Sequence, residues 1–138
     1  AKVTTPITSA IKALKKFNIN KISIFTPYTK EINDSVVEYF KKENVIINSL
    51  SYYDIASDID IGKVDQDSLF KALSNIELDN SDALFVSCTA LPVLSIIDKL
   101  EKKLNKVVLS SNQTLIWDSL NQINFKEKID GFGKLFNS

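Results

Sequence analysis

Apolar residues along this chain follow two spacings, one typical of amphipathic helices and one typical of buried strands. Four short apolar runs, at 21–26, 45–50, 83–87 and 106–110, predict strands. Between and around them, five segments repeat an apolar residue every three or four positions, as helices do. Their apolar positions are Ile7, Ala10, Ile11, Leu14 and Phe17; Ile32, Val36, Val37 and Phe40; Leu69, Phe70, Leu73 and Ile76; Val93, Ile96, Ile97, Leu100 and Leu104; and Leu115, Ile116, Leu120 and Ile123. The alternation predicts an α/β domain with a four-stranded parallel sheet, flavodoxin-like or Rossmann-like, and helices on both faces.

The ends of the predicted helices carry suitable capping residues. Three helices finish with lysines in the last turn, and Asn18, Asn44 and Asn105 follow them. Lysine complements the negative end of the helix dipole, and asparagine tolerates the left-handed backbone that ends a helix. Asp65 is the predicted N-cap of the helix that follows it. Pro92 suits the first turn of another helix, which we expect to begin there.

Length and charge are those of one domain, residues 1–138. The chain is 44% hydrophobic, which is enough to bury a core. Seventeen acidic residues balance 17 basic ones, and this zero net charge argues against a nucleic-acid partner. No apolar run approaches the ~20 residues that span a bilayer, so we expect no membrane partner and a cytoplasmic location. The chain begins at Ala1 and contains no methionine, so we expect either a removed initiator or a fragment of a longer protein.

Missing residue types narrow the chemistry further. The chain has no histidine, all 17 of its basic residues are lysine, and it has one cysteine. A Ser-His-Asp triad, a Cys-His pair, a histidine metal site and an arginine clamp are therefore excluded within the chain. An intrachain disulfide and a multi-thiolate metal site are excluded as well. With three glycines and no glycine-rich loop after any strand, the sequence disfavours a nucleotide or flavin, and we expect no cofactor and no metal.

The single cysteine, Cys88, stands where a buried strand stops, four residues before Pro92. In open α/β sheets, ligands bind at the carboxyl ends of the strands. A thiol there faces the N-terminus of the following helix, whose partial positive charge favours the thiolate and attracts anions. We therefore expect Cys88 to be reactive and partly accessible at the edge of a cleft. The alternative is that it is a small buried apolar residue, a common role of free cysteines.

Four predicted strand ends meet at the same edge of the sheet as the thiol. They carry residues 26–29, the loop 53–62, residues 87–89 and residues 110–113, which together supply hydroxyls, amides and one thiol but no positive side chain. Such a rim suits a small carboxylate held by neutral donors and backbone N–H groups. Taken singly, the parts have structural alternatives: the 110–113 run also fits a helix cap, and Tyr28 also fits an amphipathic aromatic at a rim.

The segment Cys88-Thr89-Ala90-Leu91-Pro92-Val93-Leu94, which follows an apolar strand, resembles a motif of a known family. It is similar to the second-half cysteine motif of the aspartate/glutamate racemase superfamily, where a Cys-Thr-His-x-Pro pattern follows an apolar strand. The closer resemblance is to the branch of maleate cis-trans isomerases and arylmalonate decarboxylases. It covers nearly the whole chain, but only the C-terminal half of the family's enzymes. The stretches that carry it are Cys88-Thr89-Ala90-Leu91-Pro92-Val93-Leu94, Thr26-Pro27-Tyr28-Thr29 with Asn33 downstream, and 107–113 leading to Trp117.

This resemblance implies a cofactor-independent isomerase or decarboxylase that acts on a small (di)carboxylate, in the manner of maleate isomerase. Such enzymes have two similar α/β halves with the active site between them. The resemblance implies Cys88 as the catalytic residue, through proton transfer or addition, and Tyr28, Thr89 and Ala90 as substrate-binding residues. An enediolate-like intermediate needs donors that are fixed in advance. The implied partner is an N-terminal half-domain or a second subunit, and we expect the 125–138 tail to dock on it.

The chain departs from the family pattern at two positions. Amino-acid racemases of the superfamily usually carry histidine after the Cys-Thr pair, where this chain has Ala90, and this favours the isomerase and decarboxylase branch. Where maleate isomerases place a substrate-contacting asparagine, the spacing gives Asp58, which we assign to substrate binding. A second negative charge would repel a dicarboxylate, so either the register or the substrate differs from that of a maleate isomerase.

Other function classes stay open. An amino-acid racemase, for aspartate, glutamate or a hydantoin, is one alternative, and a non-catalytic ligand-binding module on the same fold is another. A receiver domain needs clustered acids at the end of the first strand, and Thr26-Pro27-Tyr28 offers none. In a protein with both halves, a cysteine at the matching strand end of the other half would favour isomerisation or racemisation. A glycine there would favour decarboxylation.

Overall fold

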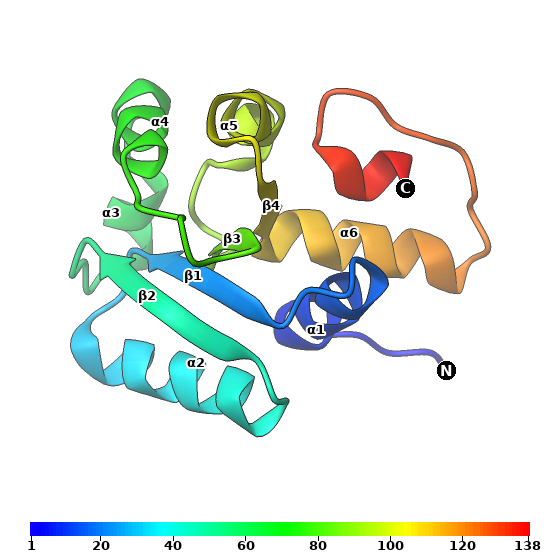
Figure 1. Cartoon of the computed structure of the whole chain (residues 1–138), viewed down its shortest axis with the longest axis horizontal. Helices are drawn as coiled ribbons and strands as arrows, with labels where there is room; N and C mark the ends of the chain where they lie inside the picture. Colours follow the sequence, from blue (N-terminus) through cyan, green and yellow to red (C-terminus); the bar gives the residue numbers. More distant parts are fainter.

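The computed structural model describes all 138 residues and contains one four-stranded, fully parallel sheet. The strands are β1 (Lys21–Thr26), β2 (Ile46–Tyr52), β3 (Ala83–Val86) and β4 (Val107–Ser110), in the order β2-β1-β3-β4 (Figure 1). Every strand is followed by a segment that leaves from the same edge, since all pairings are parallel. The predicted fold class is confirmed, and β1 begins and ends where the sequence predicts.

Helices cover both faces of the sheet (Figure 1). One face carries α1 (Pro6–Lys16), α2 (Lys30–Lys42) and α6 (Ser111–Gln122). The other carries α3 (Asp58–Gly62), α4 (Gln66–Ser74) and α5 (Ile97–Leu104). Side chains alternate along each strand, so Ile24 and Phe85 pack toward α1 and α2, whereas Phe25 and Leu84 pack toward α3, α4 and α5. The result is two apolar cores separated by the sheet.

The predicted helix ends are largely confirmed. Asn18, Asn44 and Asn105 adopt positive φ angles of 55°, 62° and 52°, as left-handed residues after a helix do. The Asp65 side chain accepts a hydrogen bond from the N–H of Ser68 at 2.9 Å and so caps α4. Ser110 caps α6 in a capping box, in which the Gln113 side chain accepts the N–H of Ser110 in return.

The predicted helix start at Pro92 is wrong. Pro92 lies in a loop, a short 3₁₀ helix η1 (Leu94–Ile96) follows, and α5 begins only at Ile97. Leu91 and Val93 on either side of the proline are almost fully buried, each 1% exposed, and the N–H of Val93 donates to the Leu91 carbonyl in a tight turn. Burial of both flanking side chains therefore takes precedence over helical continuation from Pro92.

The C-terminal tail folds back onto this chain, beside α5 and α6 (Figure 1). Its last element is a 3₁₀ helix, η2 (Lys134–Asn137), whose Leu135 is 1% exposed and joins the core on the α1 side. The buried Glu101 carboxylate accepts the N–H of Lys134 at 2.8 Å and the N–H of Val108 on the edge strand at 3.1 Å. The tail therefore covers part of the outer edge of β4. None of the helices combines the length and apolar character that crossing a membrane would require.

Candidate functional site at the carboxyl edge of the sheet

The loops after β1 and β3 and the first turn of α6 surround a cavity of about 290 Å³. Four hydroxyl-bearing side chains line it: those of Tyr28, Ser87, Thr89 and Ser111. The apolar part of its wall comes from Pro6, Ile7, Val36 and Phe85. The predicted gathering of hydroxyls is confirmed for the segments 26–29, 87–89 and 110–113, whereas the loop 53–62 does not line the cavity. These neutral donors suit an anion that is small enough for the cavity.

Cys88 lies two residues after the end of β3 and has an unusual backbone. Its φ angle is 121°, in a region that residues with a side chain rarely adopt, and such strain concentrates at functional sites. The N–H of Cys88 donates to Ser111 Oγ at 3.0 Å, and Cys88 Sγ accepts the N–H of Ala90 at 3.4 Å. The predicted partial accessibility is wrong, because Cys88 is only 4% exposed. It packs in the same apolar cluster as Leu91, and this packing shields the thiol.

Tyr28 faces the thiol from the neighbouring loop. Burial raises the pKa of the Tyr28 hydroxyl well above its usual range, and the neighbouring Cys88 thiol raises it further. The Ser87 hydroxyl lowers this pKa, and the charge of Asp58 adds a smaller upward effect. Tyr28 is therefore held as a neutral O–H donor beside Sγ throughout the ordinary pH range.

Asn33 fixes the loop that carries Tyr28. This side chain is 1% exposed, donates from Nδ2 to the Tyr28 carbonyl at 3.3 Å, and accepts a short hydrogen bond from the Thr26 hydroxyl. Thr26 Oγ1 also accepts the N–H of Tyr28 at 3.3 Å. A buried amide with both ends paired keeps the Tyr28 backbone in one position.

The other assigned residues differ in their placement. Thr89 is exposed and lines the cavity, and its carbonyl accepts a hydrogen bond from Asn112 Nδ2 at 2.8 Å. Ala90 is half-buried and directs its N–H to the sulfur. Asp58 is exposed in the first turn of α3 and does not line the cavity, although its charge acts on Tyr28. Cys88, Tyr28, Thr89 and Ala90 thus lie together, with Asp58 nearby, and their roles remain predictions.

The lysines nearest this edge are engaged in ion pairs. Lys30 Nζ lies 3.0 Å from Asp34, and Lys63 Nζ lies 3.6 Å from Asp60; all four side chains are exposed. Neither lysine lines the cavity. No group of three or more Cys, Asp or Glu side chains in the chain is arranged to hold a metal ion.

Sequence reasoning missed the contribution of α1, whose first residues Pro6 and Ile7 form part of the cavity wall. A signal was present, because a helix that precedes β1 runs antiparallel to it and brings its N-terminus to the carboxyl edge. The anchoring role of Asn112 was also missed. The 110–113 run indicated a cap or a rim, but not which loop its side chains would hold.

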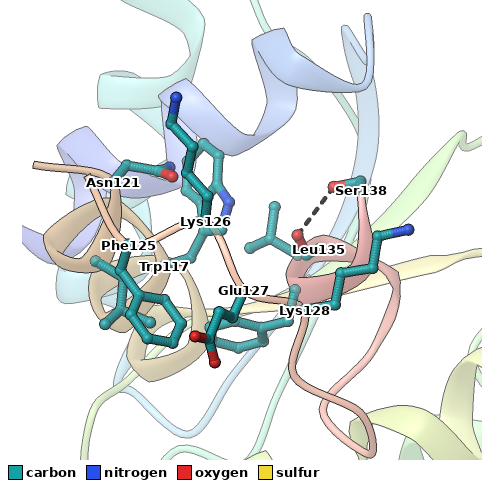
Figure 2. Close-up of a pocket in the computed structure, with 10 residues that line it drawn as sticks. Trp117, Asn121, Phe125, Lys126, Glu127, Lys128, Leu135 and Ser138 are labelled. Carbon is teal, nitrogen blue, oxygen red and sulfur yellow. Dashed lines mark hydrogen bonds between the residues drawn. The ribbon is translucent and has the colours of Figure 1, made fainter.

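A second hollow of about 190 Å³ lies near the C-terminal end of α6, away from the thiol. Figure 2 shows Trp117 and Phe125 on one side of it and Leu135 on the other, with the Ser138 hydroxyl donating to the Leu135 carbonyl at 2.9 Å. Its lining also includes Phe136, which meets Phe132 edge to face at 6.4 Å. This hollow is formed by α6 and the tail, and it contains no cysteine.

The chain resembles known proteins over nearly its whole length. The family model for arylmalonate decarboxylase matches residues 2–136. The chain is 25% identical to the maleate isomerase of Geobacillus stearothermophilus over 138 residues, which are 99% of this chain and 55% of that protein. It is 23% identical to the arylmalonate decarboxylase of Bordetella bronchiseptica over 137 residues, 97% of this chain and 57% of that protein. The chain thus spans about half the length of these curated relatives.

A solved structure shares the fold. A maleate cis-trans isomerase variant from Nocardia farcinica, which carries a covalently bound succinylcysteine intermediate, superposes with a TM-score of 0.90 at 20% sequence identity. The match covers 95% of this chain and 54% of that one. At this identity the likeness shows the fold, whereas the family model spans nearly every residue of the chain and confirms the branch that the sequence resembles. The chain belongs to the arylmalonate decarboxylase family.

Proposed function

We propose that this chain is the C-terminal half of a cofactor-independent isomerase or decarboxylase that acts on a small carboxylate, with maleate isomerase-like chemistry. Cys88 is the catalytic residue in this proposal, and Tyr28, Thr89, Ala90 and Asp58 contact or border the substrate. The observation that carries the proposal is that the only thiol lies near the Tyr28 hydroxyl, beside a cavity lined by hydroxyls. Family membership and the named activities of the relatives support it.

The proposed chemistry needs only groups of this kind. In decarboxylation, carbon dioxide leaves, its bonding electron pair stays on the substrate as an enediolate, and the Cys88 S–H donates a proton to carbon. In isomerisation, the thiolate adds to one alkene carbon, the resulting single bond rotates, and elimination releases the thiolate and the new alkene. Either path places negative charge on carboxylate oxygens, which Tyr28 and its neighbouring hydroxyls are positioned to stabilise by hydrogen bonds.

The proposal includes a second, similar half. The chain spans about half the length of its curated relatives. We propose that the other half supplies the opposing catalytic group and that the 125–138 tail contributes to docking it. Trp117, Phe132 and Phe136 are half-buried and lie beside the tail, so their remaining exposed surface is available for such a contact.

Two measurements test this function. The purified 138-residue chain should turn over maleate or an arylmalonate very poorly, because the opposing group is absent, and substantial turnover would refute the need for another half. In the assembled protein, Cys88→Ser should lower turnover by about 10²- to 10⁴-fold. It should leave the affinity for a carboxylate analogue such as succinate nearly unchanged, because the hydroxyls that hold the anion remain.

A ligand-binding module on the same fold is the second candidate, and the burial of Cys88 favours it. The two candidates differ in the reactivity of the thiol. Under the enzymatic proposal, Cys88 reacts with iodoacetamide in the native chain below pH ~9. A native thiol that stays unmodified up to that pH, and reacts only after denaturation, favours the binding module and contradicts the enzymatic proposal.

A further inference from the structure

We infer that Ser111 is an anion-binding residue of this site as well as the residue that holds the backbone of Cys88. The inference rests on the proposed function, because it concerns how the same cavity recognises a carboxylate. Ser111 is the first residue of α6, is 4% exposed, and lines the cavity together with Tyr28, Ser87 and Thr89.

Two backbone N–H groups beside the sulfur are already engaged within the chain. The N–H of Cys88 already donates to Ser111 Oγ at 3.0 Å, and the N–H of Ala90 donates to Cys88 Sγ at 3.4 Å. Two of the backbone N–H groups closest to the sulfur are therefore engaged within the chain. These two N–H groups cannot bind a carboxylate, and the side-chain hydroxyls that line the cavity are further donors for it.

Among those hydroxyls, Ser111 has a defined direction. A serine hydroxyl carries one donor proton and two acceptor lone pairs. Ser111 Oγ uses a lone pair to accept the Cys88 N–H, and it donates to no other group of the chain. Its proton is therefore free for an acceptor in the cavity that its side chain lines. The position in the first turn of a 12-residue helix adds the positive end of the helix dipole, which strengthens a bond to an anion.

The same geometry couples recognition to the thiol. Because one oxygen both accepts from the Cys88 backbone and donates into the cavity, an anion bound to Ser111 lies close to the loop that carries Sγ. Asn112, the next residue of α6, holds the Thr89 carbonyl at 2.8 Å but contributes no hydroxyl and does not line the cavity. Asn112 thus provides a matched control, since it anchors the same loop without donating to an anion there.

Paired alkylation of the single cysteine tests the inference in the 138-residue chain. Iodoacetate and iodoacetamide have nearly the same size, but only iodoacetate carries a carboxylate. With one cysteine in the chain, intact-mass spectrometry reads the modification of Cys88 alone. We expect Ser111→Ala to lower the iodoacetate-to-iodoacetamide rate ratio roughly tenfold relative to the unmodified sequence, the usual effect of losing one hydrogen bond to a charged group.

Two further variants separate recognition from loop support. Ser111→Thr keeps the hydroxyl and should keep the ratio within about twofold, whereas Asn112→Ala should change both rates by the same factor and leave the ratio unaltered. A ratio that is the same in Ser111→Ala as in the unmodified sequence overturns the inference and leaves the catalytic thiol in place. A ratio that falls equally in Asn112→Ala also overturns it, because loop support alone then explains the effect. If neither reagent modifies native Cys88, the proposed function fails and the inference fails with it.

Discussion

The loops after β1 and β3 lie side by side at the carboxyl edge of the sheet, but different parts of the chain hold them. The Tyr28 loop is held locally: Thr26 and Asn33, which are two and five residues away, contact the Tyr28 backbone and bond to each other. The Cys88 loop is held by Ser111 and Asn112, both 23 residues away from the groups they bind. The Tyr28 loop is thus fixed by the helix that follows it, whereas the Cys88 loop is fixed by a helix distant in the sequence.

Under the proposed function, this difference separates the two tasks of the site. A local anchor made of buried, fully paired groups gives the Tyr28 hydroxyl one stable position, as a preorganised donor requires. The Cys88 loop instead combines a strained φ angle with anchors at the first turn of α6, so its conformation depends on tertiary packing. Substitutions in α6 should therefore affect the Cys88 thiol, whereas substitutions in the first turns of α2 should affect the Tyr28 hydroxyl.

The largest expected effect concerns the Tyr28 loop. In the assembled protein, Tyr28→Phe should lower kcat/KM by roughly 10- to 1000-fold, because it removes one preorganised donor and leaves the ring in place. Steady-state kinetics with maleate or an arylmalonate measures it. Lys30→Ala and Lys63→Ala are the matched controls, because these lysines are nearest the edge but are exposed and paired with Asp34 and Asp60. A larger loss in either lysine variant would contradict recognition by neutral donors.

The contrast between the loops also explains what the sequence revealed. Periodicity alone predicted the strands, the helices and the meeting of strand ends, because these depend on local spacing and on the parallel arrangement. The positive φ of Cys88 and its bond to Ser111 had no local signal, since a distant segment imposes them. The burial of Cys88 was mispredicted for a related reason: the loop around Pro92 packs its apolar residues over the thiol instead of starting a helix.

The next expected effect compares the two anchors directly. Asn33→Ala should lower the free energy of unfolding by about 1–3 kcal/mol, because the buried Thr26 hydroxyl loses its acceptor and the part-buried Tyr28 carbonyl loses its donor. Asn112→Ala should cost less than about 1 kcal/mol, because water can reach its partner. Urea unfolding measures both. Equal losses in the two variants would show that the local anchor is not the stronger one.

A smaller effect tests the strain at Cys88. Cys88→Gly should be more stable than Cys88→Ala by about 1 kcal/mol, because glycine adopts a φ of 121° without a side-chain penalty. Both variants remove the sulfur, so their difference isolates the backbone. Ala83→Gly in β3 is the control, and there glycine should be the less stable residue by about 0.5–1 kcal/mol. If Cys88→Gly is also the less stable variant, the strained conformation is not intrinsic to this loop.

The smallest effect is the contribution of Tyr28 to the pH dependence of the free energy of unfolding. Burial, with the Cys88 thiol adding to it, raises the pKa of Tyr28 above its ordinary value of about 10 in the folded chain. Above pH ~10 the unfolded chain releases this proton while the folded chain keeps it, so the free energy of unfolding falls as pH rises. Tyr28→Phe should make that fall less steep above pH ~10 and leave the dependence at neutral pH unaltered, as measured by urea unfolding between pH 8 and pH ~12.

Tyr53→Phe is the comparison variant, because burial alone, without a neighbouring thiol, raises the pKa of Tyr53. Tyr53→Phe should therefore change the pH dependence less than Tyr28→Phe does. An equal change in the two variants would mean that the thiol contributes nothing to the protonation of Tyr28, and the pairing of donor and thiol at this edge would lose its main support.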